Sequence, residues 1–156
     1  MPKKPKADTS WITDDMLDAL AFRESSMNPT AFNENSGAAG MYQWMPAFWA
    51  EGKDIGFGVK SGAFDPYDPV ESRLRTKQYL EGLQKYYPEW DPSEVLMAYN
   101  WGHSKVKGLR EGTLDISKEN PKKVKEAMDY PKLILEHLKD KPWMENLDET
   151  GLEPTI

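Results

Sequence analysis

The sequence predicts a mainly α-helical single domain. Apolar residues recur at the three-to-four-residue spacing of a helix in several segments, and most of these segments begin at a polar capping residue, often followed by proline. No segment of any length shows the alternation expected of a strand. At 156 residues without cysteine, the chain has the size of one domain that folds around its own core without disulfides.

The first predicted helix begins at Thr13. Its hydroxyl is an N-cap, and Asp14 and Asp15 place two carboxylates beside the positive end of the helix dipole. One apolar face follows, made of Leu17, Leu20 and Ala21. Glu24 falls seven residues after Leu17 on that same face, so we expect its carboxylate to point inward.

An inward carboxylate is unusual and chemically useful. Burial disfavours its charged form and raises its pKa toward the range of a general acid. Arg23 is adjacent in sequence but points about 100° away around the helix, so we expect no cation beside Glu24 on this helix. The alternative is that Glu24 ends the helix and turns into water or caps a backbone amide.

The chain then turns back on itself. Asn28-Pro29 and residues 33–37 cannot continue a helix. Small residues at 37–40 allow the backbone to pass close to another surface, and Gly40 can take a positive φ. Residues 44–50 predict a short helix interrupted by Pro46, and residues 51–65 a glycine-rich loop in which a small β-hairpin stays open as an alternative.

The remaining segments are helical. Asp68-Pro69 with Glu71 predicts a capping box, and the helix that it opens ends before Pro88. A second start of the same kind, residues 91–94, opens a helix that ends near Gly102. Two further helices are predicted, one from residue 120 and one after residue 131, and the basic stretch 103–125 is interpreted as a solvated helix face.

Three ordered motifs resemble those of one family. They are Glu24-Ser25-Ser26-Met27-Asn28-Pro29, then residues 37–46 with the sequence GAAGMYQWMP, then Ala98-Tyr99-Asn100-Trp101-Gly102. Together they resemble the soluble lytic transglycosylases, the goose-lysozyme-like glycoside hydrolases of family 23. Glu126 followed four residues later by Tyr130 offers the family's last element. The resemblance covers about residues 12 to 135 and implies a lysozyme-like fold.

The resemblance implies cleavage of the β-1,4 bond between N-acetylmuramic acid and N-acetylglucosamine in peptidoglycan. Glu24 would be the single catalytic residue, protonating the glycosidic oxygen while the substrate's acetamido group stabilises the charge at C1. The Glu24 carboxylate would then take the proton of the muramic acid C6 hydroxyl, which closes a 1,6-anhydro ring. No cofactor and no metal would be needed.

Further site residues follow from the same resemblance. Gln43 would hydrogen-bond the sugar beside the scissile bond, and Tyr130 would orient the Glu24 carboxyl. Other residues implied to border the sugar cleft are Met41, Met45, Tyr99 and Asn100. Each has a structural alternative: the methionines and Tyr99 as core residues, Asn100 as a partner for backbone at a helix end, and Tyr130 as packing at a helix junction.

Two departures from the family pattern bear on the cleft. Tyr42 stands where the family has methionine before the glutamine, so we expect a phenol that stacks on or hydrogen-bonds to sugar. The loop between Glu24 and Gln43 is one residue longer than usual and carries Glu34. A second carboxylate there keeps a hydrolytic muramidase open as an alternative, with Glu34 activating water. A catalytically weak phage structural or wall-binding protein of the same fold is the other alternative.

The predicted organisation is a disordered arm at residues 1–10, a lysozyme-like transglycosylase domain at 11–141 and an acidic C-terminal tail at 142–156, pinned by Trp143. We expect a monomer that binds peptidoglycan glycan strands. The net charge of −6 argues against nucleic acid. His103 and His137 are not spaced as metal ligands.

The sequence has no apolar run long enough to insert in a membrane and no apolar region of a signal peptide near its start. An enzyme that acts on the cell wall must nevertheless leave the cytoplasm. We therefore expect a phage lysis or virion-associated protein made in the host cytoplasm, or a chain from which an export signal has been removed.

Overall fold

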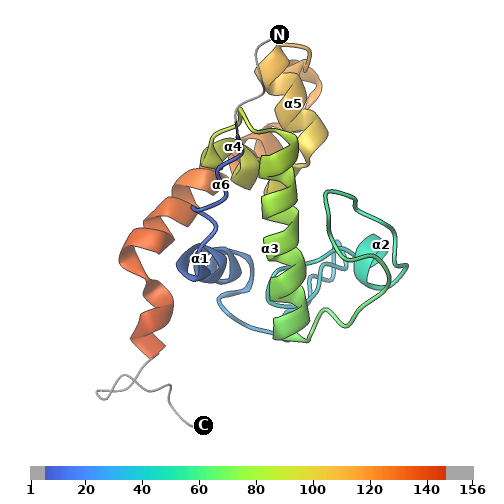
Figure 1. The fold of residues 1–156 in the computed structure, drawn as a ribbon, viewed down its shortest axis with the longest axis vertical. Helices are drawn as coiled ribbons and strands as arrows, with labels where there is room; N and C mark the ends of the chain where they lie inside the picture. The colour runs from blue at the N-terminus through green and yellow to red at the C-terminus, as the bar shows by residue number, and fades with distance from the viewer. Residues whose placement is uncertain (1–5, 147–156) are drawn as a thin grey trace.

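The computed structural model describes residues 6–146, and their secondary structure is helical (Figure 1). The α-helices are α1 (Asp14–Ser25), α2 (Pro46–Trp49), α3 (Pro69–Tyr86), α4 (Pro92–Trp101), α5 (His103–Glu111) and α6 (Pro121–Asp140), with 3-10 turns η1 (Ile116–Lys118) and η2 (Pro142–Asn146). Within residues 6–146 the β-structure is limited to two isolated bridges, Phe32 with Ala39 and Ala39 with Trp44. The mainly α-helical prediction is confirmed, and residues 51–65 form an irregular loop without a hairpin.

The predicted helix starts are confirmed by their caps. The Thr13 side chain accepts from the backbone N–H of Met16, and those of Asp68 and Asn120 cap α3 and α6 in the same way. Asp91 and Glu94 form a complete capping box at α4. The capping box predicted at Glu71 is wrong, because that carboxylate pairs instead with Arg75 at 2.9 Å.

Proline positions account for two other differences from the sequence prediction. Pro46 does not interrupt a helix but occupies the first position of α2, where a missing N–H costs nothing. Pro131 lies inside α6, which continues through it as one helix. Pro131 and Ile134 are both buried, so we attribute this continuity to tertiary packing. The basic stretch also contains a separate helix, α5, that ends at Gly112 with φ 76°.

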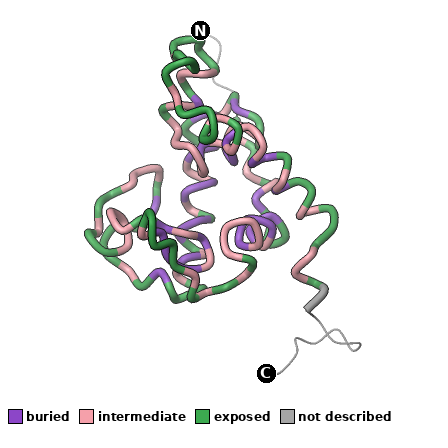
Figure 2. Tube along the Cα trace, turned by 180° about the vertical axis from the view of Figure 1, so that it is seen from behind, coloured by how far each residue is buried: buried purple, intermediate pink, exposed green. Residues whose placement is uncertain are grey.

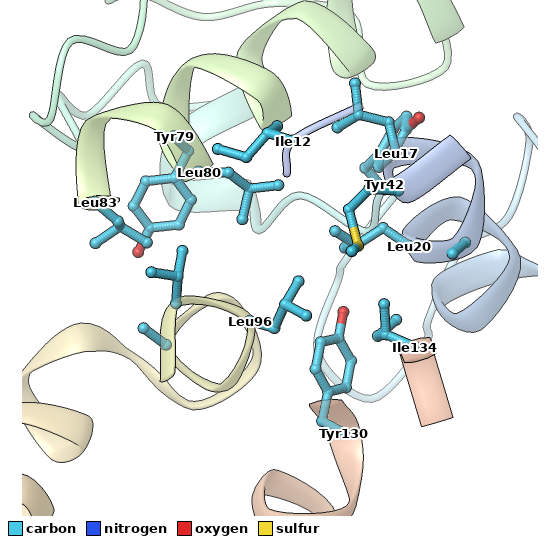
Figure 3. Packing of buried hydrophobic residues seen from close by; sticks show 14 of the residues in the cluster. Ile12, Leu17, Leu20, Tyr42, Tyr79, Leu80, Leu83, Leu96, Tyr130 and Ile134 are labelled. Atoms are coloured by element: carbon cyan, nitrogen blue, oxygen red, sulfur yellow. The ribbon is translucent and has the colours of Figure 1, made fainter. Parts of the chain in front are cut away.

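The helices enclose one core. In Figure 1, α1 lies between α3 and α6, α4 crosses the end of this group, and α2 with the loop of residues 51–65 lies on the other side of α3. Buried segments line the inner sides of α1, α3 and α4 (Figure 2). The buried side chains in Figure 3 include Leu17, Leu20, Leu80, Leu83, Leu96, Tyr130 and Ile134.

The chain ends outside the domain are described only in part. Residues 6–10 include a turn in which Ser10 Oγ donates to Asp8 at 2.6 Å, whereas residues 1–5 of the predicted arm lie outside the described residues. Of the predicted tail, residues 142–146 form η2, and Trp143 packs on the core beside Phe22. Residues 147–156 also lie outside the described part. No helix in residues 6–146 combines the length and apolar character needed to cross a bilayer.

Gly82 fixes the loop of residues 51–65 against α3. A Cβ at Gly82 would lie 1.6 Å from the backbone oxygen of Phe57. Alanine in an exposed helix stabilises by about 1 kcal/mol relative to glycine, but here we expect Gly82→Ala to destabilise the fold by about 2 kcal/mol because the loop must move. Urea unfolding of the two proteins measures the difference. A stabilised G82A variant would contradict the close approach of the loop to α3.

Candidate active site

A cleft of about 800 Å³ opens between the helical core and the loops. Six parts of the chain line it: the end of α1, the turn of residues 33–45, α2 with its following loop, α3 at Tyr79, the segment from α4 into α5, and α6. Among the predicted site residues, the lining includes Glu24, Gln43, Met45, Tyr99, Asn100 and Tyr130. Segments far apart in sequence therefore meet at one concave surface.

Glu24 lies in the last turn of α1 and its partly buried side chain lines this cleft. The inward orientation predicted from the helix pattern is thus present. Burial raises the pKa of Glu24 to about 7, and the Glu126 charge adds to this effect. The hydroxyl of Tyr130, which donates to Glu24 Oε2 at 3.2 Å, and the charge of Arg23 oppose the increase. A carboxyl with this pKa can give and take a proton near neutral pH.

Arg23 departs from the expectation that no cation lies near Glu24. Its side chain also lines the cleft, and its guanidinium carbon lies 6.0 Å from the centre of the Tyr130 ring. The 100° separation around the helix holds for the backbone, but a side chain as long as arginine extends beyond it toward α6. Arg23 therefore contributes positive charge to the cleft.

Ser25 and Tyr99 hold the turn that carries Gln43. Ser25 Oγ lies 2.8 Å from the backbone oxygen of Met41, and the hydroxyl of Tyr99 donates to the backbone oxygen of Tyr42 at 2.7 Å. The two residues therefore attach the turn to α1 and α4. Ser25 and Tyr99 therefore have a structural role, which is to hold this turn in place.

Gln43 itself has a left-handed backbone with φ 54°. Its side-chain Nε2 donates to the backbone oxygen of Gly40 at 2.9 Å. Because the amide nitrogen is engaged within the turn, the carbonyl Oε1 is the atom suited to accept from a hydroxyl or N–H group in the cleft.

Asn100 and Glu126 form a second polar pair in the cleft. Asn100 Nδ2 donates to Glu126 Oε1 at 3.1 Å, linking α4 to α6. Lys123 lies 3.8 Å from the other carboxylate oxygen. The sequence pattern gave Glu126 no role beyond its place in the family's last motif. Its spacing of four residues from Tyr130 was the available signal, since residues four apart share one helix face.

Three predicted cleft residues lie elsewhere. Tyr42 is 0 % exposed, and its hydroxyl accepts from Arg73 at 3.1 Å, so the expected sugar contact is wrong. Met41 packs against the core cluster, and Glu34 is exposed and does not line the cleft. The reason is local. The backbone turns sharply at residues 40 and 43, where φ is positive, so consecutive side chains of this motif do not all point into the cleft.

One part of the cleft could not be predicted from the sequence, and it is formed by Phe48, Asp54, Ile55, Tyr79 and His103. These residues come from α2, the loop of residues 51–65, α3 and the start of α5. They share no motif or spacing, because only the tertiary fold brings the four segments together. Within residues 6–146, no group of three or more metal-ligating side chains is arranged to hold a metal ion.

The chain matches a known protein family. The family model described as Transglycosylase SLT domain matches residues 3–120, which include Glu24, Gln43 and Asn100. Tyr130 and Glu126 lie beyond the matched range, on α6. A search of curated proteins gave no significant match. Because the match spans most of the sequence, the chain belongs to the transglycosylase SLT domain family.

Proposed function

We propose that this protein is a peptidoglycan lytic transglycosylase that cleaves the bond between N-acetylmuramic acid and N-acetylglucosamine. The observation that carries the proposal is Glu24, a carboxyl with a pKa raised to about 7 in the cleft of a transglycosylase domain. Tyr130 holds this carboxyl by a 3.2 Å hydrogen bond, and Gln43 and Asn100 line the same cleft.

The chemistry uses one carboxyl twice. Protonated Glu24 gives its proton to the glycosidic oxygen as the bond to C1 breaks, and the neighbouring acetamido oxygen stabilises the positive charge at C1. The Glu24 carboxylate then removes the proton of the C6 hydroxyl, whose oxygen bonds to C1. The 1,6-anhydro ring closes, Glu24 is again protonated and no water is consumed.

The hydrolytic alternative based on Glu34 loses its support, because Glu34 is exposed and outside the cleft. The nearer carboxylate is Glu126, which already accepts from Asn100 and pairs with Lys123. In the proposal Glu126 acts through its charge, as one cause of the raised Glu24 pKa, and does not activate water.

Product analysis tests the proposal. Purified sacculi are digested, and the chain ends of the released fragments are identified by mass spectrometry, with Glu126→Gln as a comparison. We expect anhydro-muramyl ends from both proteins. Reducing ends from the wild type that disappear in the E126Q variant would replace the proposal with a muramidase. If the wild type released no soluble sugar, a binding or structural role would be favoured.

Two substitutions around Glu24 are expected to move the pH dependence of kcat/KM in opposite directions. Activity requires protonated Glu24 in the free enzyme, so kcat/KM should fall as the pH rises through about 7. Tyr130→Phe removes a donor that favours the carboxylate, so the fall should move to higher pH. Glu126→Gln removes a nearby negative charge, so the fall should move to lower pH.

Initial rates of fragment release from about pH 5 to pH 9, spanning the titration range expected of such an acid, give both profiles. Circular dichroism confirms that each variant is folded. If both substitutions left the profile of the wild type unchanged, Glu24 would not be the group whose protonation limits the rate.

A further inference from the structure

Arg23 is an arginine in the cleft to which the mechanism assigns no task. The other arginines each pair with a carboxylate: Arg73 with Asp18 at 2.8 Å, Arg75 with Glu71 at 2.9 Å and Arg110 with Glu94 at 2.7 Å. No carboxylate of the described residues lies within ion-pair distance of Arg23. Its Nε is buried and donates to no protein group in residues 6–146.

A guanidinium without a carboxylate partner can bind an anionic ligand through its other N–H donors. The position of Arg23 suits this role. It lines the cleft, lies in the last turn of α1 one residue before Glu24 and lies beside the ring of Tyr130. An anion bound by Arg23 would therefore lie next to the reacting bond.

The charges around Arg23 favour an anionic partner. Lys123 pairs with Glu126 at 3.8 Å, and Asp54 accepts from the N–H of Gly56 within its own loop. Glu24 is neutral when it is ready to act as an acid. The positive charge of Arg23 then has no compensating carboxylate at this end of the cleft.

We propose that Arg23 binds a carboxylate of the substrate, carried by the substituent of the muramic acid residue beside the scissile bond, and so determines substrate specificity. This inference rests on the proposed function, because it concerns the same cleft and the same glycan. A guanidinium suits the task, since it binds a carboxylate through two parallel N–H donors.

Two parts of the substrate carry such a carboxylate. In strands that bear peptide stems, the carboxylates belong to the peptide, whereas in strands stripped of their stems the lactyl group ends in a free carboxylate. Both offer Arg23 the same chemistry, and the experiment distinguishes them.

The experiment measures kcat and KM for the wild type, Arg23→Gln and Arg23→Lys, with Arg110→Gln as the matched control outside the cleft. The substrates are soluble glycan strands with stems, the same strands after their carboxylates have been converted to neutral amides, and strands stripped by an amidase. We expect R23Q to raise KM on strands with stems by about tenfold. On the amidated strands R23Q and the wild type should have nearly equal KM values.

Lysine retains the charge but not the two parallel donors, so R23K should fall between the wild type and R23Q, and R110Q should match the wild type. A KM increase on stripped strands alone assigns the lactyl carboxylate as the partner, and one on strands with stems alone assigns the peptide stem. An increase on both shows that Arg23 binds either carboxylate. An equal effect of R23Q on native and amidated strands would overturn the inference while leaving the proposed function intact. A wild type that releases no sugar from any substrate would overturn both.

Discussion

Glu24→Gln is expected to lower the rate of peptidoglycan cleavage by roughly 10³-fold or more, since a positioned acid–base group contributes about 10²–10⁴-fold. The amide has nearly the same shape but cannot give a proton to the glycosidic oxygen or take one from the C6 hydroxyl. In the proposed mechanism a single residue serves both steps, so no second group among residues 6–146 is assigned to restore either one. The release of soluble fragments from sacculi under saturating substrate measures the loss.

The same variant should fold at least as well as the wild type. Burial holds the pKa of Glu24 at about 7, above the ordinary glutamate value of 4.5, so the folded state binds a proton more tightly than the unfolded chain. The associated stability is fully present below about pH 4.5 and is lost as the pH rises through about 7. At pH 8 we therefore expect E24Q to be more stable than the wild type by about 3 kcal/mol.

Thermal unfolding at pH 8 and pH 4 separates the two properties, because the stability difference should disappear at the lower pH. An E24Q variant with wild-type turnover would remove Glu24 from the mechanism. An inactive variant that was also unfolded would leave catalysis and folding unseparated, and the stability measurement at pH 8 is what excludes that reading.

Gly40→Ala is expected to destabilise the protein by about 3 kcal/mol or more, because two costs combine. Gly40 has φ 83°, and a Cβ there would lie 1.8 Å from the backbone oxygen of Pro66. Its N–H also donates to the backbone oxygen of Ala31 at 2.7 Å, and its own oxygen accepts from Gln43 Nε2. Displacing Gly40 therefore displaces Gln43 in the cleft.

Gly56→Ala is the matched control. Gly56 has a similar φ of 78°, but a Cβ there meets no atom within 4 Å, so only the backbone strain of about 1 kcal/mol remains. Urea unfolding gives both stabilities, and fragment release under conditions where the proteins are folded gives the activity. Equal destabilisation of the two variants would contradict the close contact between Gly40 and Pro66.

Local signals account for what the sequence could predict of the fold. The helix starts at Thr13, Asp68 and Asp91 depend on hydrogen bonds within four residues of the cap, which a sequence shows directly. The continuity of α6 through Pro131 depends on packing against other helices, and the sequence alone does not show this packing. Local preference favoured a break there, and tertiary packing overrode it.

The residues of the candidate site also fall into those that the sequence could predict and those that it could not. Glu24 could be placed because helix periodicity sets which face a residue occupies, and the bond from Tyr130 followed the family pattern. Tyr42 could not be placed, because its burial against Arg73 depends on the turns at residues 40 and 43. The prediction that Arg23 points away from Glu24 was wrong, because helix periodicity gives the direction of the Cα–Cβ bond and not the position of the guanidinium at the end of a long side chain.

The proposed mechanism depends most directly on the protonation of Glu24. With ¹³C-labelled glutamate, the carboxyl signal present in the wild type and missing in E24Q can be followed by NMR as the pH is varied. We expect a midpoint near 7, because burial raises the pKa of Glu24 against the opposing effects of Tyr130 and Arg23. A midpoint near 4.5, the ordinary value for a glutamate, would contradict the proposed mechanism, because Glu24 would then be ionised at neutral pH and unable to act as the acid.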